Sequence, residues 1–384
     1  MLKHTEATLP AQWYFDTAHF HRELEKIWYQ DWICVGHVSE WSQTGQFQRA
    51  TIGDQQVLVI RDRDGCLRAF HNTCRHRGAE LCAESEGRVR AGRLVCPYHG
   101  WAYGLDGALQ SVPRSMRAAD FDLQDYPLYP VAIDEWRGFV FINLDAKGSL
   151  PLADTVAAEA QWVERWPLEK LALAHREAHE IHCNWKVFWE NYMECCHCPV
   201  VHQDLVRLVP HYGEGLNERE DLPDAHPLRT RHGPLKDGAV TWSGDGDTPL
   251  PHFKGLGASE QAAGMTFSTH LPAFFLVGHV DYVRTVRVQP LGPERTRLVV
   301  DWFLAPEALS GDLDVERLVA FGRQVVMEDA QVCEINQRGL HSRAHRAGVL
   351  TPPEYEIRDL HDWLRARLDD PAPSAGPRAV AGTP

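Results

Sequence analysis

The sequence contains no apolar run that approaches the roughly 18 residues of a membrane-spanning helix, so we expect no membrane segment. It also lacks an excess of positive charge, because 39 Lys and Arg residues are outnumbered by 53 Asp and Glu residues and the net charge is -14. That charge argues against nucleic acid and against an anionic membrane surface as partners. Residues 1–6 have no apolar core, which argues against a secretory signal.

The chain also lacks an internal repeat and any nicotinamide or flavin fingerprint, so electrons from NAD(P)H would have to come through another protein. Ten cysteines in 384 residues do not make a disulfide scaffold. Free thiols suit a reducing compartment, and we therefore expect a cytoplasmic protein. The length is enough for two domains, each with its own core.

Cysteine and histidine nevertheless gather in two half-motifs near the front of the chain. Cys74 and His76 form C-x-H, and after 19 intervening residues Cys96 and His99 form C-x-x-H. In a Rieske 2Fe-2S centre one iron binds two Cys and the other binds two His, so each half-motif supplies one ligand to each iron. The alternative is a tetrahedral zinc site, although zinc knuckles more often pair Cys with Cys.

These residues resemble the Rieske proteins. Respiratory members carry an extra Cys in each loop, joined as a disulfide that raises the potential. The corresponding positions here are Ala79 and Tyr98, so that bridge cannot form. The resemblance therefore implies a low-potential cluster of the kind found in oxygenases.

We predict four segments from the changes in pattern along the chain. Residues 1–32 form an N-terminal helical segment that packs on the catalytic domain, 33–147 a small all-β domain with the cluster, 148–370 a second domain, and 371–384 a disordered tail. Asp16 or Thr17 is the expected N-cap of a helix over residues 20–32.

Regular elements are expected at defined places within these segments. The predicted strands lie at residues 57–60, 139–142, 172–181, 281–288 and 297–303, and the predicted helices at 154–166, 184–197, 315–337 and 357–368. Residues 212–262 are rich in Gly, Pro and Asp and form either a long loop covering a pocket or a disordered insertion.

A second metal site is expected in the second domain. Glu190, Glu194 and His197 share the polar face of the predicted helix over 184–197, and Pro199 is expected to break that helix before His202. Such a break would bring the two imidazoles to one point. Alone, the H-x-x-x-x-H spacing is a weak signal.

Asp329 strengthens that prediction. It lies in the apolar stripe of the helix predicted over 315–337, where an unpaired carboxylate is costly and needs a cation. Two His and one carboxylate form the facial triad of non-heme ferrous oxygenases. The alternative partner is a salt bridge to Arg323 or Arg338.

At this point nearly the whole chain resembles the α (terminal oxygenase) subunits of Rieske non-heme iron oxygenases. The motifs that carry the resemblance are Arg75-His76-Arg77-Gly78-Ala79, Asn184-Trp185-Lys186, Glu190-Asn191, Glu194-Cys195-Cys196-His197-Cys198-Pro199 with His202, Glu328-Asp329, and Gln337-Arg338-Gly339-Leu340. The family implies an α+β architecture, in which an all-β Rieske domain is joined to a helix-grip (START-like) catalytic domain with an antiparallel sheet.

The resemblance also implies roles for single residues. Cys74, His76, Cys96 and His99 match the cluster ligands, and His197, His202 and Asp329 match the ligands of a mononuclear Fe(II). Glu194 matches the carboxylate that bridges the cluster of one subunit and the iron of the next in a homotrimer, and Asn191 matches an amide near the iron. Many members carry Asp at the position of Glu194 and Tyr at that of Cys196.

The implied activity is reduction of dioxygen with NAD(P)H electrons that arrive through a separate reductase or ferredoxin. The spacing around Asp329 most resembles the subgroup that oxidises choline, betaine, carnitine and stachydrine, which hydroxylates or N-demethylates quaternary ammonium compounds. Five aromatic residues are available for a cation-binding cage, although most of them are expected to be ordinary core residues: Trp185, Trp189, Phe267, Phe274 and Phe275. The alternatives are an aromatic ring-hydroxylating mono- or dioxygenase, a Rieske electron carrier without oxygenase activity, and a domain that only binds a hydrophobic ligand.

Overall fold

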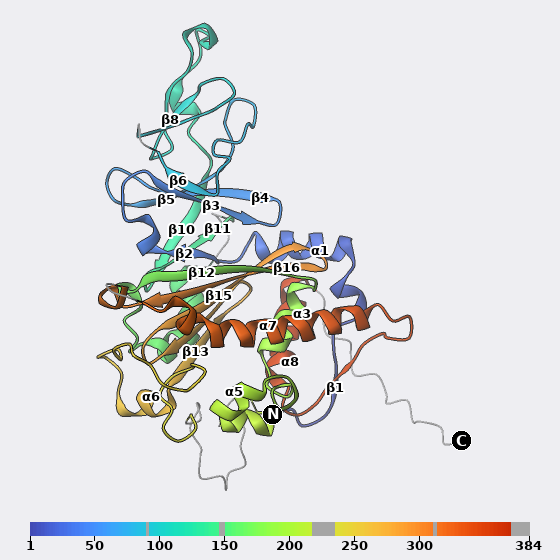
Figure 1. Cartoon of the computed structure of the whole chain (residues 1–384). Helices are drawn as coiled ribbons and strands as arrows, with labels where there is room; N and C mark the ends of the chain where they lie inside the picture. The colour runs from blue at the N-terminus through green and yellow to red at the C-terminus, as the bar shows by residue number, and fades with distance from the viewer. Residues whose placement is uncertain (90–91, 146–149, 217–234, 310–312, 370–384) are drawn as a thin grey trace.

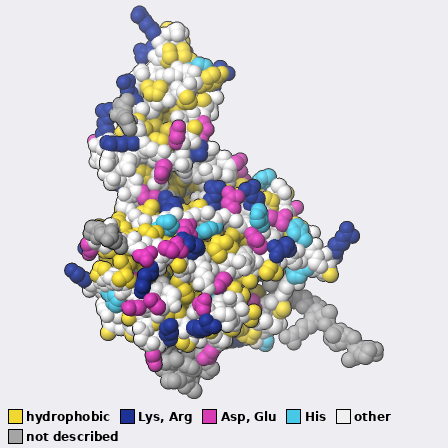
Figure 2. All heavy atoms as spheres, viewed as in Figure 1, with side chains coloured by type: hydrophobic (Ala, Val, Ile, Leu, Met, Phe, Trp, Pro, Cys, Tyr) yellow, Lys and Arg dark blue, Asp and Glu magenta, His cyan; other side chains and the backbone are white. Residues whose placement is uncertain are grey.

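The computed structural model describes residues 1–89, 92–145, 150–216, 235–309 and 313–369. Figure 1 shows a β-rich upper part above a mixed lower part, and the space-filling view shows the same division as a narrow lobe on a broader one (Figure 2). The predicted α+β architecture is confirmed. Within the described ranges, no helix has both the length and the apolar character needed to cross a bilayer.

The upper part is built from two antiparallel sheets. The larger has the strand order β2-β11-β10-β5-β4-β3-β6 and the smaller the order β7-β8-β9. Their strands are β2 (Ile33–His37), β3 (Gln46–Ile52), β4 (Gln55–Arg61), β5 (Leu67–His71), β6 (Glu86–Arg88), β7 (Arg93–Val95), β8 (Ala102–Gly104), β9 (Leu109–Ser111), β10 (Pro130–Trp136) and β11 (Phe139–Asn143). The small sheet holds one cluster loop directly before β8, and the other loop follows β5.

The lower part is a five-stranded antiparallel sheet covered by helices. Its strand order is β12-β16-β15-β14-β13. The strands are β12 (Ala172–Ile181), β13 (Met265–His270), β14 (Phe274–His279), β15 (Val283–Gly292) and β16 (Arg295–Leu304). The helices are α2 (Leu152–Ala160), α3 (Trp185–Tyr192), α4 (Cys198–Val201), α5 (Gln203–Leu208), α6 (Ala258–Ala263), α7 (Val315–Leu340) and α8 (Tyr355–Arg367).

Helix α7 lies across one face of this sheet (Figure 1). Its apolar stripe is buried, as the sequence periodicity requires, and includes Val319, Val326 and Cys333. Asp329 lies in the same stripe at 3% exposure. The fold therefore places one carboxylate inside the apolar layer between helix and sheet, where it needs partners.

The N-terminal segment contacts the lower part through a buried ion pair. Helix α1 (Thr17–Glu23) begins at the predicted N-cap Asp16, whose carboxylate accepts a hydrogen bond from the His19 N–H at 2.7 Å. Glu23 at its end is fully buried and binds the ammonium of Lys186 on α3. This pair joins the first helix to the element that leads into the candidate metal site.

Each predicted strand and helix overlaps an observed element. Most strands of the upper part, two strands of the lower sheet, helices α4, α5 and α6, and several boundaries were not predicted. Strands β13 and β14 were not predicted, because the Gly/Pro-rich pattern before them obscures the alternation. The predicted helix over 154–166 is shorter, since α2 ends at Ala160 and a 3-10 turn follows. Part of the predicted loop over 212–262, the predicted boundary after residue 147 and the predicted tail over 371–384 lie outside the described residues.

His270 lies where the upper and lower parts meet, and its protonation makes the stability of the fold depend on pH. Its ring packs against Trp136 of β10 with 4.7 Å between ring centroids, and Ser268 Oγ is 2.8 Å from its Nε2. Burial lowers the pKa of His270 to about 4. Because this pKa is below the ordinary value of about 6.5, the unfolded state takes up the proton first, and the fold is destabilised as the pH falls from 6.5 towards 4.

We therefore expect protonation at this position to cost about 2 kcal/mol of stability at pH 5 relative to pH 7. The melting temperature of the wild type should fall several degrees more between these two pH values than that of His270→Gln, which cannot take up this proton. Equal falls in the two proteins would show that His270 does not contribute.

Candidate active site

The two cluster half-motifs form a pair of matching turns. The Gly78 N–H donates to the Cys74 carbonyl and the Gly100 N–H donates to the Cys96 carbonyl, both at 3.0 Å. Both glycines have positive φ, +74° and +70°, which a side chain would disfavour. The turns direct His76 and His99 at each other, with 3.1 Å between their Nδ1 atoms.

The two thiols of the half-motifs are buried. Cys74 and Cys96 are each 2% exposed, and the Tyr103 hydroxyl lies 3.2 Å from the Cys74 sulfur. Burial raises the pKa of the Cys74 thiol. Two imidazole nitrogens that face each other and two buried thiols, one of each from each half-motif, are the donor set of a Rieske cluster, so the residues fit that group.

The second site begins where α3 ends, and here one prediction is wrong. The helix expected over 184–197 stops at Tyr192, so Glu194 and His197 do not share a helical face with Glu190. Beyond the helix end, the Glu194 carboxylate accepts hydrogen bonds from the backbone N–H groups of Cys196 and His197. This local turn competes with helical hydrogen bonding and ends the helix.

Pro199 also has a different role from the predicted one. It lies in the first turn of α4, where the missing N–H costs nothing, and so it begins a helix and does not break one. His197 directly precedes this one-turn helix and His202 directly follows it. The short helix therefore brings both imidazoles to one side, as the spacing required.

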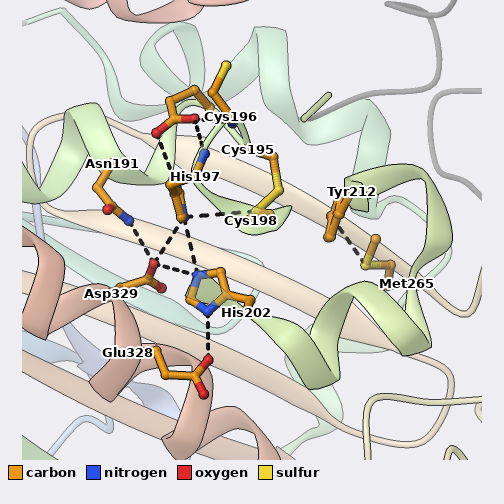
Figure 3. Close-up of a disulfide and its surroundings, with 11 residues drawn as sticks. Asn191, Cys195, Cys196, His197, Cys198, His202, Tyr212, Met265, Glu328 and Asp329 are labelled. Carbon is orange, nitrogen blue, oxygen red and sulfur yellow. Dashed lines mark hydrogen bonds and ion pairs between the residues drawn. A yellow bond between two sulfur atoms is a disulfide. The ribbon is translucent and has the colours of Figure 1, made fainter. Parts of the chain in front are cut away.

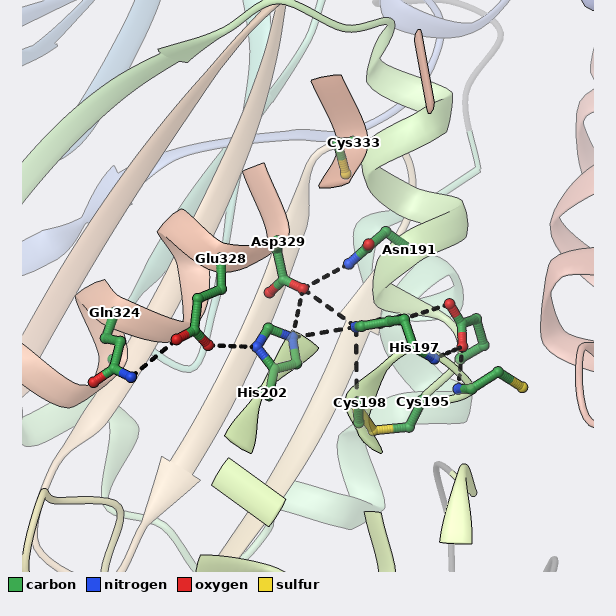
Figure 4. A network of polar contacts seen from close by, with 12 residues as sticks. Asn191, Cys195, His197, Cys198, His202, Gln324, Glu328, Asp329 and Cys333 are labelled. Carbon is green, nitrogen blue, oxygen red and sulfur yellow. Dashed lines mark hydrogen bonds and ion pairs between the residues drawn. A yellow bond between two sulfur atoms is a disulfide. The ribbon is translucent and has the colours of Figure 1, made fainter. Parts of the chain in front are cut away.

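Three donor atoms converge at this point (Figure 4). His202 Nε2 lies 3.2 Å from His197 Nε2 and 2.9 Å from Asp329 Oδ1, and His197 Nε2 lies 3.4 Å from the same oxygen. Asn191 donates to Asp329 Oδ1 at 2.7 Å. The alternative partner Arg323 instead pairs with Glu177 and Glu316. Two imidazole nitrogens and one carboxylate on one face fit a ferrous ion with open coordination positions.

Each imidazole is held from behind by a carboxylate. His197 Nδ1 lies 2.6 Å from Glu194, and His202 Nδ1 lies 2.7 Å from Glu328. A carboxylate at Nδ1 keeps the proton there and leaves Nε2 free to bind a metal. Gln324 in turn donates to Glu328 at 2.9 Å, as Figure 4 shows.

These contacts decide the charges at the site. Burial by itself would lower the pKa of His197, but the hydrogen bonds to Asp329 and Glu194 raise it to about 9. Burial would raise the pKa of Asp329, yet the two imidazoles lower it. The carboxylate therefore stays ionised, and a metal ion would replace the imidazole protons that now balance it.

Cys195 and Cys198 are joined by a disulfide that flanks His197 (Figure 3). The expectation of free thiols is therefore wrong for this pair, because the turn between α3 and α4 brings their Cα atoms to 5.0 Å. The Cys198 sulfur lies 3.9 Å from His197 Nε2, but a sulfur in a disulfide is not a thiolate ligand. Asp329 is therefore the third ligand that the geometry offers.

A cavity of about 330 Å³ opens beside the three donor atoms. Of the five predicted cage residues, Phe267 and Phe275 line it. The other three do not: Trp185 donates to Glu23, Trp189 donates to the Pro272 carbonyl, and Phe274 packs in a separate core. This outcome agrees with the prediction that most of the five are ordinary core residues. The sequence could not show which of them line the cavity, because burial in a helix–sheet core and burial at a cavity wall have the same sequence pattern.

Four further residues at the site were assigned no role from the sequence. They are Glu328 behind His202, Tyr212 and Trp242 in the cavity wall, and Arg284 in the same wall. Glu328 directly precedes Asp329, so an acidic pair on one helix was an available signal. Tyr212 and Trp242 come from the segment expected to cover a pocket, and nothing local marks Arg284.

Comparison with known families agrees with both sites. Residues 31–127 match the Rieske [2Fe-2S] domain, and residues 168–370 match the catalytic domain of the ring-hydroxylating alpha subunit. The zinc alternative for the first site is therefore rejected.

Several curated proteins align along almost the full chain. The glycine betaine monooxygenase oxygenase subunit of Pseudomonas aeruginosa is 31% identical over 98% of this chain and 93% of its own length. The chloroplastic choline monooxygenase of Beta vulgaris is 30% identical over 94% of this chain and 77% of its own length.

Solved structures have the same fold. The quaternary ammonium Rieske monooxygenase CntA in complex with gamma-butyrobetaine is 25% identical with a TM-score of 0.74, covering 94% of this chain and 96% of CntA. Naphthalene 1,2-dioxygenase from Rhodococcus sp. is 21% identical with a TM-score of 0.73, covering 94% of this chain and 95% of that one. At that identity the dioxygenase shares the fold, and nothing about substrate follows.

Proposed function

The chain belongs to the Rieske non-heme iron oxygenase α-subunit family, and from this premise we propose that it oxidises a small quaternary ammonium compound, by hydroxylation or N-demethylation. The observation that carries the proposal is the convergence of His197, His202 and Asp329 beside a cavity with aromatic walls. The relatives named above that are 30% and 31% identical act, by name, on choline and glycine betaine.

We propose the predicted ligands as the metal-binding residues. Cys74, Cys96, His76 and His99 would hold the 2Fe-2S cluster, and the facial triad would hold Fe(II). Together these centres supply electrons and dioxygen activation when bound. The protein's own part is to orient the imidazoles through Glu194 and Glu328, to hold Asp329 through Asn191, and to enclose the substrate away from water.

The separation of the two candidate metal sites within one chain supports an assembly of several subunits. Figure 1 places β8, beside the cluster loops, at the top and α5, beside His202, at the bottom. We propose a homotrimer in which the surface around His76 and His99 of one subunit meets the Glu194 surface of the next. Val200 is 81% exposed and lies between the candidate ligands His197 and His202 in the sequence. A solved structure of a quaternary ammonium Rieske monooxygenase, 24% identical to this chain, gave insights into inter-subunit electron transfer in that enzyme.

The remaining predictions enter this proposal unchanged. Electrons from NAD(P)H would come through a separate reductase or ferredoxin in the cytoplasm. Residues 1–32, 33–147 and 148–370 would be the N-terminal segment, the Rieske domain and the catalytic domain. The electron-carrier and ligand-binding alternatives leave the converged triad without a role.

Product analysis tests the proposal. The iron-loaded protein, supplied with a generic reductase and NADH, should consume oxygen when glycine betaine, carnitine or choline is added. The products should be formaldehyde or an oxidised alkyl group. Formation of a phenol or diol from aromatic compounds, with no response to any of the three ammonium compounds, would contradict it.

A further inference from the structure

Strand β15 places one buried arginine in the wall of the active-site cavity. Arg284 is 2% exposed and lines the cavity together with Asn191, His197 and Asp329. Its Nη1 donates to the Gly322 carbonyl of α7 at 3.1 Å. Its Nε is also buried and has no hydrogen-bond partner in the part of the chain that the structure describes.

The other buried arginine of this strand is arranged differently. Arg287, at 6% exposure, donates from Nε and Nη2 to the Asp301 carboxylate at 3.2 and 3.0 Å. Arg284 makes no ion pair with a carboxylate among the described residues. Because a guanidinium cannot lose its proton, a buried one without an anion is costly. Arg284 in the cavity wall therefore lacks an anionic partner within the described part of the chain.

The rest of the wall favours a cation. The aromatic residues that line the cavity include Tyr212, Trp242, Phe267 and Phe275. The carboxylates of Glu159 and Asp359 line it as well. Aromatic faces and carboxylates both attract a quaternary ammonium group. One cavity thus offers a site for a positive group and a separate site for a negative group.

Arg284, the site for a negative group, is close to the proposed metal ligands. Burial raises the pKa of Tyr192 to about 12, while Arg284 lowers and Asp329 raises the same pKa. Tyr192 and Arg284 line the same cavity as His197 and Asp329. The Arg284 guanidinium carbon lies 5.9 Å from the centre of the Trp242 ring. A small molecule with charges of both signs can therefore reach both walls.

We propose that Arg284 binds the carboxylate of a small zwitterionic substrate, a betaine, while the ammonium group of that substrate lies against the aromatic wall. This inference rests on the proposed function and narrows it, because choline has a hydroxyl group where a betaine has a carboxylate. A guanidinium and a carboxylate form paired, charge-assisted hydrogen bonds that a hydroxyl cannot replace.

Kinetics of the iron-loaded enzyme with glycine betaine and choline test the inference, with substrate-stimulated oxygen uptake as the assay. Arg284→Met should raise KM for glycine betaine roughly 30-fold to 100-fold, the loss expected for hydrogen bonds to a charged group. KM for choline should change by less than about 3-fold. Arg284→Lys keeps the positive charge but loses the paired N–H donors of the guanidinium. Its KM for glycine betaine should lie between those of wild type and Arg284→Met.

Arg287→Lys is the matched control, because it alters a buried arginine on the same strand that already has a carboxylate. It should change the melting temperature but not the ratio of the two KM values. An iron content of about three per chain shows whether the catalytic domain of each variant is folded. Equal losses for both substrates in Arg284→Met and Arg284→Lys would overturn the inference while the proposed function stands. Oxidation of neither ammonium compound by the wild type would overturn both.

Discussion

His202→Ala is expected to remove the mononuclear iron and to abolish substrate oxidation, while the cluster is kept. His202 is 1% exposed, and its Nε2 is the donor closest to both other proposed ligands, at 3.2 Å from His197 Nε2 and 2.9 Å from Asp329 Oδ1. Without it the site has two donors, which do not retain a ferrous ion in competition with water. Iron content should fall from about three to about two per chain, and product formation by at least roughly 100-fold.

His179→Ala is the control for this experiment. His179 is half-buried, and its Nε2 lies 3.1 Å from a carboxylate oxygen of Glu177 as the His202 ring lies beside Glu328, but His179 is on β12 and not among the proposed ligands. That variant should keep all the iron. If His202→Ala also retains about three irons per chain, His202 is not a ligand, and the oxygenase proposal loses its basis.

Glu194→Ala is expected to keep both metal centres and to lose coupled turnover by roughly 10-fold to 100-fold. Its carboxylate orients His197 from 2.6 Å and also accepts the backbone N–H groups of Cys196 and His197. Removing it frees the imidazole to rotate and removes the group proposed to link neighbouring subunits. Iron content together with the ratio of product to oxygen consumed measures both effects.

Glu328→Ala separates these two roles. Glu328 holds His202 from 2.7 Å, as Glu194 holds His197, but it lies on α7 with its other oxygen bound by Gln324. Both variants should keep both metal centres. We expect only Glu194→Ala to slow reoxidation of the reduced cluster when oxygen and substrate are added. Product formation at the wild-type rate by Glu194→Ala would remove this residue from the electron route.

The cluster ligands were predictable because their chemistry is local. Each half-motif spans three or four residues, and a turn with a glycine at positive φ suffices to direct Cys and His to one point. His197 and His202 were predictable for the same reason, although the local path between them was not. The sequence patterns could not show that Glu194 ends α3 by binding backbone N–H groups.

The residues that line the cavity were not predictable, since their identity depends on which face of a strand points to α7. Phe274 and Phe275 are adjacent in the sequence, but only Phe275 lines the cavity. Successive side chains of a strand point to opposite faces, so a shift of one residue in the register would exchange their roles. Strands β13 and β14 were not recognised, and so neither face could be assigned.

By itself, therefore, the amino-acid sequence determined the kind of metal centres, the family and the approximate order of the elements, because these depend on residues close together in the chain. Tertiary structure alone decided how Asp329 meets His197 and His202 across more than a hundred residues, and why Arg284 lacks the carboxylate that Arg287 has. The physical reason is that the cost of a buried charge depends on neighbours brought close by packing, which sequence spacing does not encode.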